Sequence, residues 1–312
     1  MVVGTPRSGT TLLQRLAIES CSLASVPETH FFSCFPRLLA NAKGPSGGGT
    51  KETLRAALEE YARVDLLRGA SLDVDAVLGV LDGRAIDVFD VFDVVVSVLA
   101  GGQDRLCEKT PGHLWWWEAI ARARPRTKFV MMIRDPRSVV ASMTQTGFAG
   151  QSLAEYTEWW RHDQRLVSSA SASLGERCLV LRYEDVVGDE VGTRARLKRF
   201  CVPPTGAPSD GQPVRGAPMV LPWETWKAGF DAPVSTGRVS SWRASLSADD
   251  ASYIARVTAS QMEQFGYGAD ATALSAGRER PSLRVQRAGR RASITLYRRR
   301  QRRLLSRTVD LS

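Results

Sequence analysis

The sequence has few histidines, no long apolar run and no cysteine pattern of a recognisable kind. The longest apolar stretch, residues 94–100, is far too short to cross a bilayer, which takes about 20 apolar residues. Only three of the 312 residues are histidine, and the five cysteines lack metal-type spacing. These scarcities predict neither a metal site nor a disulfide framework, and we expect reduced thiols.

The positive charge is confined to the C-terminal end. The chain has a formal net charge of +9, yet residues 278–312 hold twelve arginines against Glu279 and Asp310. The rest is nearly neutral, so we expect no nucleic-acid partner. Residues 276–312 are predicted to form a basic tail, a weak helix or disordered arm. This tail either contacts an anionic membrane surface or acidic partner peripherally or is solvated without a partner.

A glycine-rich loop lies close to the first residue. Residues 1–3 predict a short strand, residues 4–11 are GTPRSGTT, and apolar residues at helical spacing follow. A strand–loop–helix turn of this kind directs backbone N–H groups at one point and predicts an anion site, a plain glycine turn being the alternative. The glycine spacing matches the phosphate-binding loop G-x-x-x-x-G-K-[ST], but Thr10 replaces its lysine and Arg7 supplies the cation.

The loop also bears on location, because it begins at the fourth residue and no secretory signal precedes it. We therefore expect a cytoplasmic protein. The first strand is short, and we expect that the start of the strand, or of the protein, lies upstream.

Predicted strands alternate with predicted helices. The apolar run of residues 128–133 predicts a buried parallel strand, and residues 138–143 a helix after it. Residues 155–169 predict another helix, residues 178–182 a third strand and residues 191–200 a further helix. The alternation predicts an α/β fold with a central parallel sheet between helical layers.

A helical cap is predicted as an insertion over about residues 40–105. Residues 51–67 and 72–99 have helical spacing, whereas residues 23–32 predict a short strand or extended edge that Pro27 breaks. We expect the acceptor pocket beside this cap.

Three further segments match motifs of one enzyme family, in chain order. Arg134 and Ser142 belong to R-D-P-R-x-x-x-x-S, and Tyr183 belongs to R-Y-E-D. Arg238 and Trp242 lie in T-G-R-V-S-S-W-R. Together with the first loop, these motifs resemble the sulfotransferases that use 3′-phosphoadenylyl sulfate (PAPS), in particular bacterial sulfotransferase-like proteins related to the tyrosylprotein sulfotransferase group.

The resemblance implies a P-loop-like three-layer fold over residues 1–275 and a site for PAPS. In that family the first loop holds the 5′-phosphosulfate of PAPS. The resemblance therefore assigns binding of this group to Arg7, Ser8, Gly9, Thr10 and Thr11. The 3′-phosphate would lie on Arg134 and Ser142, because a guanidinium grips phosphate bidentately and a hydroxyl adds a donor. Tyr183 would lie near the nucleotide.

The late loop closes over the nucleotide in this family, which assigns Arg238 and Trp242 to cofactor binding. Tyrosylprotein sulfotransferases carry a lysine before the tryptophan, whereas this chain has Ser241. Arg238 or Arg243 could supply the missing charge.

Three residues are predicted to be catalytic by the same resemblance. Glu28 lies twenty-one residues after Arg7 in an E-T segment like that of the family's base, and a carboxylate beside an anion site is better explained as a base than as a ligand. Lys109 matches a lysine that faces the transferring sulfuryl group, and with Arg7 it would stabilise developing charge. His30 and His113 stay open as alternative bases.

We therefore predict a sulfotransferase that moves a sulfuryl group from PAPS to a hydroxyl or amine of a carbohydrate, lipid or small natural product. The products are the sulfated acceptor and 3′,5′-ADP, and no metal is required. The alternatives are a P-loop kinase-like phosphotransferase that uses ATP and an inactive nucleotide-binding protein. The acceptor and the oligomeric state are left open.

Overall fold

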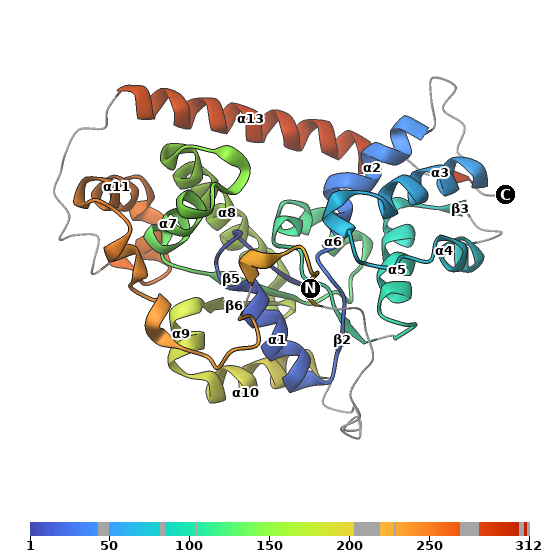
Figure 1. The fold of residues 1–312 in the computed structure, drawn as a ribbon, viewed down its shortest axis with the longest axis horizontal. Coiled ribbons are helices and arrows are strands. Elements are labelled where there is room, and N and C mark those ends of the chain that lie inside the picture. The colour runs from blue at the N-terminus through green and yellow to red at the C-terminus, as the bar shows by residue number, and fades with distance from the viewer. Residues whose placement is uncertain are drawn as a thin grey trace.

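A parallel β-sheet forms the centre of the protein (Figure 1). The computed structural model describes residues 1–42, 50–81, 85–103, 105–202, 219–227, 229–268, 281–305 and 309–310. The strands are β1 (Val2–Gly4), β2 (Ala24–Ser25), β4 (Leu106–Cys107), β5 (Phe129–Ile133) and β6 (Cys178–Arg182). Strand β5 pairs with β1 and β6, strand β2 pairs with β4, and a bridge between Val2 and Lys109 joins the two groups.

Helices cover both faces of this sheet because its side chains alternate between two apolar clusters. Val130 and Met132 pack into one cluster, Met131 and Ile133 into the other. The first face is covered by α1 (Thr10–Cys21), α9 (Tyr183–Gly188) and α10 (Glu190–Cys201). The second is covered by α6 (Trp117–Ala123) and α8 (Leu153–Leu174), with α7 (Pro136–Thr146) and α11 (Ala248–Gln264) packed on α8. The predicted three-layer α/β fold is confirmed.

Short 3-10 helices connect these elements. They are η1 (Asp65–Leu67), η2 (Pro111–Trp116), η3 (Phe148–Gly150), η4 (Gly175–Arg177), η5 (Thr225–Lys227), η6 (Thr236–Arg238) and η7 (Ser241–Ala244).

The helical insertion lies between β2 and β4 and forms one side of the molecule (Figure 1). Its helices are α2 (Phe31–Ala42), α3 (Lys51–Ala62), α4 (Val74–Leu81) and α5 (Val88–Leu99). The predicted helical stretch of residues 72–99 consists of two helices, because strand β3 (Ala85–Ile86) separates α4 from α5. Asp87 and Asp90 form a capping box that begins α5 anew.

The predicted extension of residues 23–32 is correct only at its start. Strand β2 ends at Ser25, and His30 has a left-handed φ of 48° that turns the chain. Phe31 and Phe32 therefore begin helix α2 instead of continuing a strand. Both rings are fully buried in the apolar core of the insertion.

Most of the predicted basic tail folds onto the body of the protein. Helix α13 (Pro281–Leu305) runs across α8 to α2 (Figure 1). Strand β7 (Val309–Asp310) pairs antiparallel with β3. Residues 276–280, 306–308 and 311–312 lie outside the described residues, and contact of the tail with a membrane or partner stays a prediction. None of the helices in the described ranges is long and apolar enough to span a bilayer.

Candidate active site

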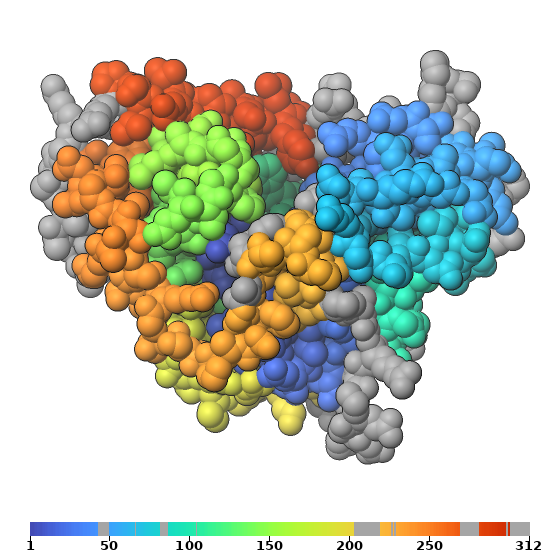
Figure 2. All heavy atoms as spheres, in the orientation of Figure 1, coloured from blue at the N-terminus to red at the C-terminus, as the bar shows by residue number. Residues whose placement is uncertain are grey.

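The carboxyl ends of the parallel strands carry nearly all of the predicted functional residues. The glycine-rich loop follows β1, Glu28 follows β2, and Lys109 follows β4. Arg134 and Tyr183 follow β5 and β6. This edge is where open α/β sheets bind ligands. A cavity of about 1520 Å³ lies there, larger than the roughly 300–1,000 Å³ of common ligand sites. Its size suits two substrates held together, and Figure 2 shows the surface hollowed between α7–α8 and the segment that contains η6.

The glycine-rich loop has the geometry of an anion site. Arg7 and Gly9 have left-handed φ values of 70° and 93°, and an arginine there is held against its own preference. A Cβ on Gly9 would come within 2.5 Å of the Tyr183 ring, so only glycine fits. No side chain caps the start of α1, and Ser8 Oγ is buried without a partner among the described residues. Donors are therefore left over for a ligand.

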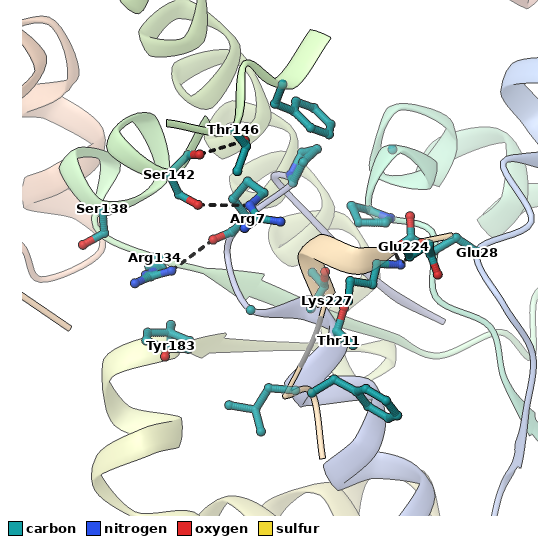
Figure 3. A pocket seen from close by; sticks show the side chains of 18 of the residues that line it. Arg7, Thr11, Glu28, Arg134, Ser138, Ser142, Thr146, Tyr183, Glu224 and Lys227 are labelled. Carbon is teal, nitrogen blue, oxygen red and sulfur yellow. Dashed lines mark hydrogen bonds and ion pairs between the residues drawn. The ribbon is translucent and has the colours of Figure 1, made fainter. Parts of the chain in front are cut away.

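Two arginines join this loop to the loop after β5 (Figure 3). Arg7 Nε donates to Ser142 Oγ at 3.0 Å. Arg134 donates to the carbonyl oxygens of Arg7 at 3.2 Å and Arg238 at 2.6 Å. The Arg134 guanidinium also stacks on the Tyr183 ring, 4.2 Å from its centroid. The contacts bring the predicted 5′-phosphosulfate and 3′-phosphate residues to one place.

The arginines form a cationic cluster that nearby carboxylates influence only at a distance, since none of those described pairs with Arg7 or Arg134. Burial lowers the pKa of Arg7, and Arg134 and Arg238 lower it further. Burial also lowers the pKa of Arg134. Within the part of the chain that the structure describes, neither Arg7 nor Arg134 forms an ion pair with a carboxylate, and Arg134 Nε is buried without a partner. Buried charges are normally paired, so the cluster suits an anionic ligand.

Glu28 is the centre of a second charged group, on the other side of the cavity in Figure 3. Its Oε1 accepts from Lys109 and, at 2.6 Å, from Lys227, whereas its Oε2 lies 3.4 Å from His30 Nε2. Lys109 also reaches Thr11 of the loop, at 3.3 Å. Burial acts to raise the pKa of Glu28, but Lys109, His30 and Lys227 outweigh it and hold this pKa well below its ordinary value. Glu28 is therefore ionised at neutral pH.

Lys227 is a member of this site that the sequence did not indicate. It lies in η5, almost two hundred residues after Glu28, and also pairs with Glu224. Burial would lower the pKa of Lys227, but Glu28 and Glu224 raise it. Lys109 differs, because burial lowers its pKa despite Glu28. No local spacing marks Lys227, since only the fold brings η5 to Glu28.

The segment that bears Lys109 is fixed by its neighbour Glu108. Buried Glu108 accepts from Thr29 at 3.0 Å, from Thr110 at 2.6 Å, and lies 3.2 Å from His113 Nδ1. His113 is fully buried against the Phe32 ring and does not line the cavity. Of the two histidines left open as bases, the structure brings only His30 to Glu28.

The predicted site residues fall into three groups by their position. The cavity is lined by Arg7, Gly9, Thr10, Thr11, Glu28, Arg134, Ser142, Tyr183 and Arg238. Ser8 and Lys109 are fully buried behind this lining. Trp242 packs on the Arg137 guanidinium at 4.2 Å and does not line the cavity, so its predicted contact with the nucleotide has no support in this geometry. Among the described residues no group of three His, Cys, Asp or Glu side chains is placed to hold a metal ion.

Asp163 lies behind the cavity and gives a prediction about stability. It is buried on α8 and accepts from Trp115 Nε1 at 2.6 Å, and burial raises its pKa to about 7. An unfolded aspartate has a pKa of about 3.9, so the folded protein holds this proton more tightly and loses stability as the pH rises from about 4 to about 7. In urea unfolding, Asp163→Asn should be more stable than wild type near about pH 8, by up to about 4 kcal/mol, and no more stable near about pH 4. A difference independent of pH would contradict this account.

The fold and the site together define a P-loop-like α/β protein with a glycine-rich loop whose geometry suits an anion. The chain belongs to the sulfotransferase family, because the model of that family matches residues 1–204. The resemblance found in the sequence is thereby confirmed.

Similar proteins agree with this assignment. Protein-tyrosine sulfotransferase 1 of Danio rerio is 28% identical over 191 residues, which cover 59% of this chain and 47% of that protein. Protein-tyrosine sulfotransferase of Drosophila melanogaster is 24% identical over 267 residues, 79% of this chain and 47% of that protein. The chain thus spans about half the length of the curated relatives it matches. The solved sulfotransferase domain from the curacin biosynthetic pathway has the same fold, with a TM-score of 0.51, 19% identity and coverage of 85% of this chain and 96% of that one.

Proposed function

We propose that this protein transfers the sulfuryl group of PAPS to an acceptor hydroxyl and releases 3′,5′-ADP. The observation that carries the proposal is the cluster of Arg7, Arg134 and Arg238, which line the cavity beside an uncapped helix start and of which Arg134 is buried. It offers cations and hydroxyls at two adjacent loops, which suits a nucleotide phosphorylated at two positions. A triphosphate site would instead call for the P-loop lysine, and Thr10 occupies that place.

The residues present fit PAPS. Ser8 Oγ and Arg134 Nε are buried donors without partners among the described residues, and Gly9 lets the loop pack directly against the Tyr183 ring. The loop and Thr11 would hold the 5′-phosphosulfate, and Arg134 with Ser142 the 3′-phosphate. Arg7, which donates to Ser142, would neutralise charge between them. Bound PAPS supplies an activated sulfuryl group.

Glu28 is proposed as the base that takes the acceptor proton. Both lysines occupy Oε1, so Oε2, on the His30 side, is the oxygen available to an acceptor hydroxyl. A carboxylate whose pKa is this low is a weak base, so it receives the proton once the acceptor oxygen has begun to bond to sulfur and become acidic. The neutralised Glu28 then leaves Lys109 and Lys227 free to stabilise negative charge at the loop.

A phenolic hydroxyl, such as that of a peptide tyrosine, is the first acceptor class to test. The relatives are named for protein tyrosine, and rings of Trp115 and Trp116 line the same cavity as His30. This choice differs from the carbohydrate, lipid and natural-product acceptors that the sequence suggested.

A thermal-shift comparison tests the donor. PAPS and 3′,5′-ADP are expected to raise the unfolding temperature most, without added magnesium, because a ligand that binds only the folded state stabilises it. ATP and GTP serve as the matched comparison, with and without magnesium. A larger shift with magnesium–ATP would favour the phosphotransferase instead.

A further inference from the structure

One part of the cavity has aromatic walls, and we call it the aromatic chamber. Trp115, Trp159 and Phe148 line it, and the Trp159 ring lies 6.1 Å from Trp115 and 5.9 Å from Phe148. This aromatic chamber adjoins Glu28 through Trp116, Pro111 and His30, which line the same cavity. If the loops take the donor as proposed above, the aromatic chamber is the space left for the acceptor.

Helix α13 closes this chamber, although it lies beyond the part of the chain that the family model matches. Its residues Leu283, Arg287, Arg290, Ile294 and Tyr297 are its less exposed positions, spaced three or four apart as on one helix face. Ile294 is buried, and the Tyr297 ring lies 5.5 Å from Trp115. Ile294, Tyr297 and Arg290 all line the cavity.

Arg290 is the unusual member of this packed face, because it brings a charge to an aromatic wall. Its guanidinium stacks on Trp159, 4.6 Å from the ring centroid. Burial lowers its pKa, and Glu155 and Asp163 are the nearby carboxylates that act in the opposite direction. Among the described residues Arg290 forms no ion pair with either, and its Nε is buried without a partner.

We propose that Arg290 determines acceptor specificity by binding an anionic group on an acceptor whose ring lies against Trp159 and Trp115. The proposal rests on the proposed function for the identity of the donor side of the cavity. A flat guanidinium already held on an aromatic ring is pre-ordered to pair with a carboxylate. The alternative is that Arg290 serves only to pack α13 on Trp159. Only the proposed role makes binding of a ligand depend on the charge of that ligand.

Binding of a matched ligand pair separates these cases. The probes are para-hydroxyphenylpropionate and its primary amide, which share ring and hydroxyl and differ in charge, and quenching of tryptophan fluorescence reports their binding without PAPS. Wild type is expected to bind the carboxylate about tenfold or more tightly than the amide. Arg290→Gln should abolish this preference and leave the affinity for the amide unchanged, whereas Arg290→Lys should keep part of it.

Arg299→Gln is the matched control, since it removes the same charge from an exposed position of α13. It should keep the wild-type preference, which excludes a general effect of net charge. Equal affinity of wild type for both probes, or a preference that survives Arg290→Gln, would overturn the proposal. Because the assay omits the donor, loss of sulfuryl transfer with the preference intact would count against the proposed function and not against Arg290.

Discussion

Glu28→Gln is expected to lower turnover at least about a hundredfold while the affinity for 3′,5′-ADP stays near wild type. Glutamine keeps the shape of the side chain but cannot take a proton from the acceptor. It also removes the negative charge that Lys109 and Lys227 share at Glu28 Oε1. Initial rates and calorimetry on the same preparation measure the two quantities.

Two variants control this experiment. Lys227→Gln leaves the base in place and removes one of its partners, so it should lower turnover less than Glu28→Gln. His30→Ala should also cost less, because His30 lies 3.4 Å from Glu28 Oε2 and acts through it. Near-normal turnover in Glu28→Gln together with collapse in His30→Ala would transfer the role of base to His30.

The second large effect is expected at the 3′-phosphate. Arg134→Ala should weaken binding of 3′,5′-ADP by about tenfold to a hundredfold, because it removes a charged hydrogen-bonding group worth about 1.5–3 kcal/mol. Binding of 5′-AMP, which lacks the 3′-phosphate, should change much less. Wild type should accordingly prefer 3′,5′-ADP over 5′-AMP strongly in calorimetry.

The comparison with 5′-AMP also tests whether the variant is intact. Arg134 holds the carbonyl oxygens of Arg7 and Arg238, so its loss could distort the loop as a whole. A distorted loop would weaken both nucleotides equally. If Arg134→Ala weakened binding of both nucleotides equally, or if wild type bound both with equal affinity, Arg134 would not be the residue that binds the 3′-phosphate.

Local patterns in the sequence were sufficient for most of the sheet and for its anion loop. The apolar run at residues 128–133 and the turn at residues 4–11 carry their own signals, because buried strands and glycine turns depend on neighbouring residues. The carboxyl ends of parallel strands meet at one edge, so residues that follow separate strands, such as Arg134 and Tyr183, could be expected to meet.

Features set by long-range contacts escaped prediction. Lys227 reaches Glu28 across almost two hundred residues, and Arg290 meets Trp159 through the docking of α13 on α8. Neither contact can be predicted from the spacing of residues in the sequence. The turn at His30 was missed for another reason, since a left-handed φ in a non-glycine residue is a local cost that the packing of Phe31 offsets.

The most direct test of the central claim is to follow radiolabelled sulfate from PAPS in the presence of wild-type protein and a tyrosine-containing peptide, without metal. The account predicts that label moves to the peptide hydroxyl, that 3′,5′-ADP appears in equal amount, and that Glu28→Gln slows both by at least about a hundredfold. Small phenols, sugars and lipids take the place of the peptide in parallel reactions, and release of 3′,5′-ADP reports transfer to any of them or to water. Release of 3′,5′-ADP no faster than in Glu28→Gln, with every acceptor, would contradict the account.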